Sequence, residues 1–179
     1  SRIGPFTSAG ATGISIFNID GNLTVDGARL QAGSSSTLGT GTGIFNLGGN
    51  FTLTSTSTVA TNFAGPIAFN FKGTAPQTVS LGINLQMGIT INDTIAAGAS
   101  VIFDIDTLKF GSLSGGSFVV NGSLELKGAS KIQGPGSFSL EDNATLKVAH
   151  PEGIATDATG CIIVTGTRTF STNASYIYN

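Results

Sequence analysis

The sequence has no tryptophan, and it has one residue each of cysteine, histidine and methionine. A single cysteine cannot form an internal disulfide or a cysteine-based zinc site. Charge is scarce too, because only 10% of the residues are Asp, Glu, Lys or Arg and the net charge is -2. A nucleic-acid-binding protein needs clustered Lys and Arg, so we exclude this class. No run of about 18 apolar residues occurs, so we expect no transmembrane helix.

Small and polar residues are abundant instead. Gly, Thr, Ser and Asn together supply 80 of the 179 residues. Hydrophobic residues still make up 40% of the chain and the mean hydropathy is +0.27, which is too apolar for a disordered coil. Helix signals are nearly absent, because strong helix formers never recur at spacings of three and four. The composition therefore predicts a folded all-β protein.

Short segments of alternating apolar and polar residues support this prediction. Each is about 3–6 residues long and is bounded by Gly, Asn, Asp or Ser, which is typical of half-buried strands that end in turns. The clearest are residues 14–17, 23–25, 51–54, 68–71, 101–105, 124–126, 138–140 and 146–148.

The chain also repeats itself. Residues 17–25 match residues 45–53 in register, and both segments begin with Phe-Asn. A third Phe-Asn pair begins at residue 69. Periods of 20–50 residues indicate a solenoid or a related array. We therefore predict a parallel β-solenoid (β-helix) of roughly seven coils, whose strands stack about 4.8 Å apart. In-register stacking predicts an internal ring column and an outward or corner amide ladder, formed by Phe17, Phe45 and Phe69 and by Asn18, Asn46 and Asn70.

The repeat also suggests how the chain is organised. We expect residues 1–150 to form the coils. Residues 151–179 would form a loop followed by a further coil or a junction to the next module, in a single domain that is a slice of a longer repeat protein. The alternative is an antiparallel β-sandwich, in which Asn121-Gly122 would be a hairpin turn. The in-register repeat favours the solenoid, because a sandwich gains nothing from it.

The C-terminal third resembles a known family. Its segments NATLKVAHPEGI (143–154) and TGTRTFSTNASYIYN (165–179) are similar to motifs in the giant repeat cell-surface adhesins of Bacteroidetes. That family includes the SprB-like gliding-motility adhesins. The resemblance implies a secreted, outer-membrane-associated surface adhesin or filament that is exported by the type IX secretion system.

Paired carboxylates are the first candidate chemistry. Asp104 and Asp106 lie two apart on an expected strand, so they would share one face. Such a pair could bind Ca²⁺ or perform acid/base chemistry on a polysaccharide. No neighbouring coil offers acids in register, so we interpret the pair as part of a solvated outer face.

The other reactive side chains also lack partners. His150 shares a loop with Glu152 and Asp157, but no second histidine exists to complete a zinc triad. We expect His150 to be a turn element and Cys161 to be a small buried hydrophobe. The sequence thus predicts no catalytic, cofactor-binding or metal site.

Threonines raise two further hypotheses. Thr52, Thr54, Thr56 and Thr58 alternate and would face one side of a strand, as in an ice-binding solenoid, although the neighbouring coils do not repeat the pattern. Separately, the segments Asp-Thr-Ile at 93–95 and Asp-Thr-Leu at 106–108 look like the O-glycosylation sequon common in Bacteroidetes. The candidate glycosylation sites are Thr94 and Thr107.

Together these observations predict a non-enzymatic structural or adhesive segment of a bacterial cell-surface filament. Its expected partners are neighbouring repeats of the same chain and extracellular surfaces or polysaccharides, contacted weakly and many times. The alternatives are a polysaccharide-active or carbohydrate-binding β-helix protein and an ice-binding solenoid. Scattered arginines and the lack of tryptophan count against the first of these.

Overall fold

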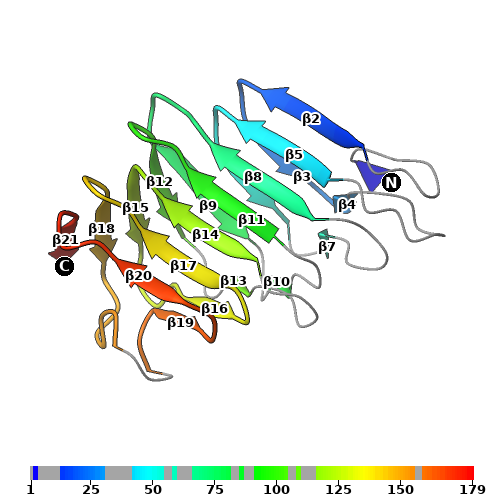
Figure 1. The fold of residues 1–179 in the computed structure, drawn as a ribbon. Coiled ribbons are helices and arrows are strands. Elements are labelled where there is room, and N and C mark those ends of the chain that lie inside the picture. Colours follow the sequence, from blue (N-terminus) through cyan, green and yellow to red (C-terminus); the bar gives the residue numbers. More distant parts are fainter. Residues whose placement is uncertain are drawn as a thin grey trace.

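The computed structural model describes residues 2–3, 13–30, 42–54, 58–59, 66–81, 85–86, 91–104, 108–109, 116–155 and 159–179. Within these ranges the chain forms 21 β-strands and no helix. The strands lie side by side in a stack that runs from the N-terminal to the C-terminal end (Figure 1). The all-β prediction is therefore confirmed.

Two long sheets, which we call sheet 1 and sheet 2, contain seven strands each. Sheet 1 contains β2 (Ile14–Ile19), β5 (Thr42–Leu47), β8 (Ile67–Phe71), β11 (Ile91–Ile95), β14 (Ser117–Val120), β17 (Ser137–Leu140) and β20 (Arg168–Phe170). Sheet 2 contains β3 (Leu23–Val25), β6 (Phe51–Leu53), β9 (Gln77–Leu81), β12 (Ser100–Phe103), β15 (Ser123–Leu126), β18 (Thr145–Val148) and β21 (Ser175–Tyr178).

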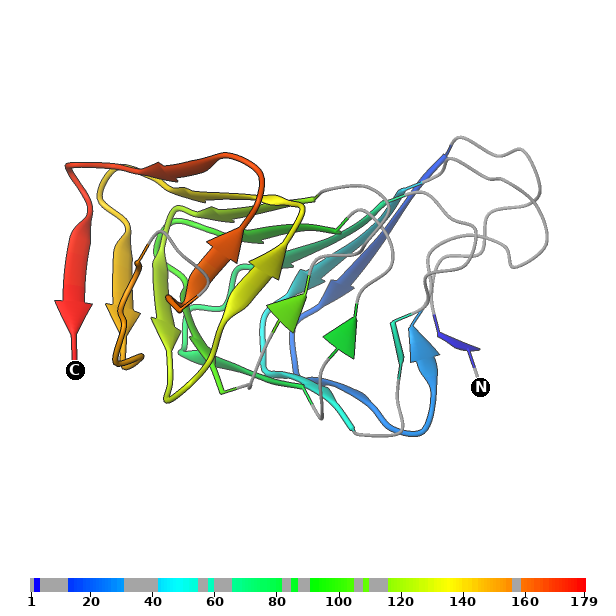
Figure 2. The same ribbon diagram turned by 90° about the horizontal axis from the view of Figure 1, so that it is seen from below.

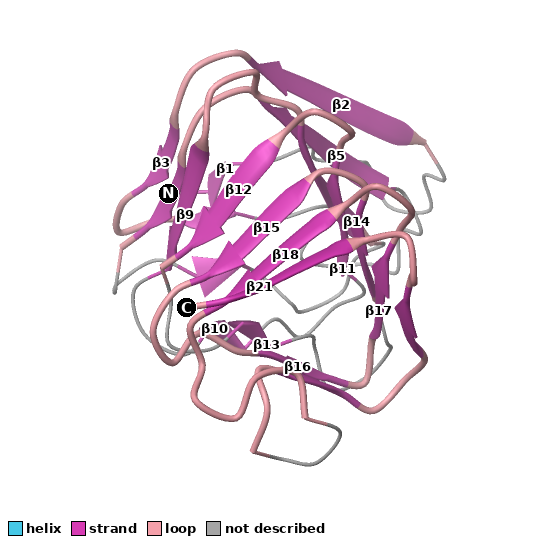
Figure 3. Cartoon of the chain, turned by 90° about the vertical axis from the view of Figure 1, so that its left-hand side faces the viewer, coloured by secondary structure: helices cyan, strands magenta, loops and turns pink. Residues whose placement is uncertain are grey.

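Two short sheets supply the remaining strands. One has three strands, β1 (Arg2–Ile3), β4 (Arg29–Leu30) and β7 (Thr58–Val59). The other has four strands, β10 (Leu85–Gln86), β13 (Leu108–Lys109), β16 (Ile132–Gly134) and β19 (Ile162–Val164). The chain visits sheet 1, sheet 2 and a short sheet in turn, so that one coil comprises, for example, β5, β6 and β7. Figure 3 shows this circuit from the C-terminal end.

Neighbouring strands in sheets 1 and 2 come from successive coils and pair in parallel. Seven strands in each long sheet confirm the predicted parallel β-solenoid of roughly seven coils. The antiparallel sandwich is wrong. Asn121-Gly122 joins β14 in sheet 1 to β15 in sheet 2, so this pair forms a corner between sheets and not a hairpin. Figure 2 shows the stacked coils from a second direction.

The core follows from strand alternation, because every second side chain points inward. In β8, Ile67, Phe69 and Phe71 are buried while the residues between them are partly exposed. The same alternation in neighbouring strands stacks like residues on one another. Each buried Phe contributes about 1.5–3 kcal/mol of transfer free energy.

The predicted ring column is confirmed. Phe17, Phe45 and Phe69 are paired in register. The ring centroids of Phe17 and Phe45 are 5.2 Å apart, and those of Phe45 and Phe69 are 5.4 Å apart. Both pairs of rings are stacked. Farther along the same column, the rings of Phe118 and Phe138 stack at 6.0 Å. These stacked rings lie between the sheets and hold the thin interior together.

The corners between sheets 1 and 2 are made in two ways. At Gly98 and Asn143 the backbone has φ of 81° and 64°, a region that Gly and Asn adopt most readily. At Gly48 the backbone φ is not positive, but a Cβ atom would lie 2.7 Å from the carbonyl oxygen of Asp20 in the preceding coil. Glycine there is required by the close approach of two coils.

Residues 151–155 form a turn, and the chain then returns to the stack. Strand β19 pairs with β16, β20 with β17 and β21 with β18, all in parallel. Strands β20 and β21 thus extend the same two long sheets by one coil. In the described part of the chain, none of the elements is a helix that could cross a membrane.

Candidate functional site

The outward face of sheet 1 carries a hydrogen-bonded row of amides, which we call the asparagine ladder: Asn18, Asn46 and Asn70. The amide of Asn46 donates to Oδ1 of Asn18 at 2.7 Å, and the amide of Asn70 donates to Oδ1 of Asn46 at 2.9 Å. The three residues are paired in register, so the predicted ladder is confirmed. Each amide keeps part of its hydrogen-bonding capacity facing solvent, because Asn18 is exposed and the other two are half-buried.

The row continues in the same register beyond the ladder with other residue types. Thr94 pairs with Asn70, and Val119, Ser139 and Thr169 follow on successive strands. Apart from Val119, these side chains end in a hydroxyl group. The outward face of sheet 1 therefore presents a nearly continuous line of neutral hydrogen-bonding groups along the stack.

A second polar row lies where the chain enters sheet 2. Oδ1 of Asn22 accepts a hydrogen bond from the backbone N–H of Asn50, and Oδ1 of Asn50 accepts one from the backbone N–H of Thr78, both at 2.8 Å. The next positions in register are Ile102, Glu125 and Lys147. Nζ of Lys147 lies 3.9 Å from Oε2 of Glu125, so these two residues form an ion pair. The amide row therefore ends after Asn50, and the later coils carry an apolar side chain and then two charged side chains at this position.

The predicted threonine face is wrong. Strand β6 ends at Leu53, and Thr58 begins β7, which belongs to a different sheet. Thr56 lies outside the described residues. On the outward face of sheet 2, Thr24 pairs with Thr52, but the next coil places Ser80 in that register. In the described part of this face, the rank of threonines in register therefore comprises Thr24 and Thr52.

The structure places one of the two candidate glycosylation sites. Thr94 lies on the outward side of β11 and is partly exposed, whereas its sequon partners Asp93 and Ile95 point inward and are buried. Two of the three side chains of this sequon are therefore inside the core. Thr107 lies outside the described residues.

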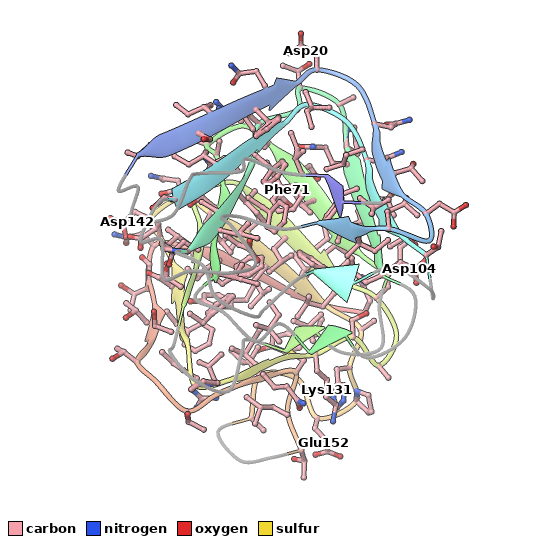
Figure 4. The ribbon with its side chains drawn as sticks, turned by 90° about the vertical axis from the view of Figure 1, so that its right-hand side faces the viewer. Asp20, Phe71, Asp104, Lys131, Asp142 and Glu152 are labelled. Carbon is pink, nitrogen blue, oxygen red and sulfur yellow. The ribbon has the colours of Figure 1, made fainter. Side chains whose placement is uncertain are left out.

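Only one member of the carboxylate pair, Asp104, lies in the described part of the chain. Strand β12 ends at Phe103, so Asp104 follows the strand and is exposed. Asp106 lies outside the described residues. Figure 4 shows Phe71 inside the stack and the labelled charged residues at its periphery, namely Asp20, Asp104, Lys131, Asp142 and Glu152.

The remaining candidates occupy structural positions. Nδ1 of His150 accepts a hydrogen bond from the backbone N–H of Glu152 at 3.2 Å, so the two residues form part of the turn. Asp157 lies outside the described residues. Cys161 is buried, as expected, and burial raises the pKa of its thiol to about 11. Among the described residues, no group of three or more His, Cys, Asp or Glu could hold a metal ion.

Sequence reasoning missed the chemically most unusual side chain, Asp93, which it treated only as part of a sequon. Asp93 is 3% exposed, and its Oδ1 atom has no hydrogen-bond partner among the described residues. Burial raises the pKa of this carboxyl to about 8, an effect that the backbone N–H of Phe69 partly offsets. The signal was present, because Ile91 and Ile95 flank Asp93 at a spacing of two and predict that all three point inward.

The asparagine ladder makes a testable prediction. Replacing Asn46 by Asp removes the donor to Oδ1 of Asn18, so we expect the free energy of unfolding to fall by about 1 kcal/mol at neutral pH. Urea unfolding at pH about 7 and about 3 measures this effect. The loss should shrink at the lower pH, because a protonated carboxyl can donate again. An equal loss at both pH values would mean that the hydrogen bond is not the cause.

We compared the chain with protein-family models, curated proteins and solved structures. No family model, no curated protein and no solved structure matches the chain.

Proposed function

We propose that this chain is a non-enzymatic structural and adhesive segment of a secreted bacterial cell-surface filament, similar in role to the giant repeat adhesins of Bacteroidetes. It would present its outward polar rows to polysaccharides or other hydrated extracellular surfaces. The observation that carries the proposal is the asparagine ladder with its continuation through Thr94 along sheet 1. Neutral amides and hydroxyls at a regular spacing match the hydroxyl groups of a polysaccharide.

The parallel stack supports the structural half of the proposal. Each coil adds about 4.8 Å, so seven coils span about 34 Å, and further coils would lengthen the stack without changing its cross-section. Hydrogen bonds between successive coils run along this direction in every sheet. A chain built this way carries the ladder groups at fixed positions, which is what repeated weak contacts with a surface require.

A binding experiment tests the adhesive half. Beads that display many copies of the chain should be retained on immobilised polysaccharides, whereas the single soluble chain should bind weakly, because multivalency raises avidity by about 10²–10⁴. The variant with Asn18, Asn46 and Asn70 all replaced by Ala should lose retention. A matched variant with the exposed Thr165 and Thr172 replaced by Ala should keep it.

Three outcomes contradict the proposal. Retention of the alanine-ladder variant at the wild-type level would mean that the ladder is not the contact surface. Failure of the beads to bind any of a broad set of polysaccharides and hydrated surfaces would remove the adhesive role. Cleavage of a polysaccharide by the purified chain would replace it with the enzymatic alternative.

A further inference from the structure

The ring column of sheet 1 is interrupted at the middle coil. Strand pairing places Asp93 directly between Phe69 of the preceding coil and Phe118 of the following coil. In the first six coils, five of the six residues at this inward register position are Phe. They are Phe17, Phe45, Phe69, Phe118 and Phe138. The fourth coil alone among these presents a carboxyl group to the core.

Among the described residues, the inward side chains around Asp93 offer no compensating charge. The described inward side chains on its own strand, on both neighbouring strands of sheet 1 and on the facing strand of the same coil are all apolar and buried. They are Ile91 and Ile95 of β11, Ile67, Phe69 and Phe71 of β8, Phe118 and Val120 of β14, and Val101 and Phe103 of β12. None of these groups titrates. An ionised carboxyl here would be an unpaired charge in an apolar interior, which is strongly unfavourable.

We propose that Asp93 is an internal proton-binding site that couples the stacking of the middle coils to pH. The protonated carboxyl is tolerated between the rings of Phe69 and Phe118. Loss of the proton leaves a carboxylate whose Oδ1 atom has no partner in the part of the chain that the structure describes, and this weakens the contacts of β11 with β8 and β14. The middle coil is thus the point at which the stack loosens first as the pH rises.

The direction of the effect follows from proton linkage. In the unfolded chain the pKa of Asp93 is near its ordinary value of 3.8, and in the folded chain burial raises it to about 8. Between these values the folded protein holds a proton that the unfolded chain releases. The stabilisation of the fold by the protonated Asp93 is therefore complete below pH about 4. It declines as the pH rises and is lost above pH about 8. Over this window the unfolding equilibrium constant should rise about tenfold per pH unit.

Urea unfolding of three proteins between pH about 4.5 and 8.5 tests the proposal. We expect the ratio of the wild-type unfolding constant to that of Asp93→Asn to rise about tenfold per pH unit, because the amide cannot ionise. The matched control is Asp104→Asn, which removes an exposed carboxyl and should follow the wild type. Hydrogen bonds from Ser171 and Asn173 lower the pKa of Asp142, so this residue also makes the stability depend on pH. It is present in all three proteins, and its contribution therefore cancels in the ratio of their unfolding constants. A ratio that does not change with pH would overturn the proposal.

A second measurement needs no variant, and so it stands even if Asp93→Asn does not fold. Carbon-detected NMR of the wild-type protein follows each carboxyl group through a pH titration. The Asp93 carboxyl should titrate far above its ordinary value of 3.8, with a midpoint near 8. Hydrogen exchange at matched pH should show that amides of β11 lose protection before those of β5. A midpoint near 4, or uniform loss of protection along the stack, would overturn the proposal.

Discussion

Replacing Phe69 by Ala is expected to lower the free energy of unfolding by about 3–5 kcal/mol, the range for removing a buried phenyl ring. Phe69 is 1% exposed, and its ring centroid lies 5.4 Å from that of Phe45 and 5.1 Å from that of Phe51. It therefore bridges the ring column of sheet 1 and the inward side of sheet 2. The cavity would remain open, because the hydrogen-bonded strands on either side cannot collapse into it.

Urea unfolding followed by circular dichroism measures this loss. Phe69→Leu keeps most of the volume and removes the ring contacts, so it should cost only about 1 kcal/mol. Tyr178→Ala removes an aromatic ring that is 60% exposed on the last strand, and it should change the stability by less than about 0.5 kcal/mol. Equal losses for Phe69→Ala and Tyr178→Ala would mean that the column does not hold the coils together.

Replacing Gly136 by Ala is expected to destabilise the stack by about 2–3 kcal/mol through overpacking. Gly136 precedes β17, and a Cβ atom there would lie 2.7 Å from the carbonyl oxygen of Gly116 in the preceding coil. A Cβ atom on Gly166 of the following coil would in turn lie 2.5 Å from the carbonyl oxygen of Gly136. Three glycines thus stack at one corner, and a methyl group on the middle one would push adjacent backbones apart.

The matched control is Gly21→Ala, at a corner where a Cβ atom would meet nothing within 4 Å and the φ angle is not positive. Its stability should stay within about 0.5 kcal/mol of the wild type. Thermal unfolding of the two variants side by side measures the difference. If Gly136→Ala were as stable as Gly21→Ala, the close approach of coils at this corner would not constrain the sequence.

The repeat of Phe and Asn was sufficient to predict the fold and the asparagine ladder. Two residues that recur in register, one apolar and one polar, indicate which side of each strand faces the core. When such strands stack in parallel, like residues must lie on one another. The prediction therefore extended correctly from Phe17 and Asn18 to their partners in the next two coils.

The buried acid could not be placed in this way. The ladder partners are 28 residues apart at the first step and 24 at the second, so the coils differ in length. Without a constant period, the sequence does not show which residue of the fourth coil lies under Phe69. Asp93 was consequently assigned to a surface sequon, although the alternation of Ile91 and Ile95 around it predicts an inward side chain.

The all-β character, the parallel stacking and the side of the strand on which each Phe and Asn of the repeat lies could all be predicted from the amino-acid sequence. These properties depend on local alternation and on recurrence along the chain. The placement of Thr52 and Thr58 in different sheets, and of Asp93 where other coils have a ring, became visible in the folded stack. The physical reason is that the corners, whose lengths vary, set where each strand begins, and the neighbouring coil then sets what each side chain meets.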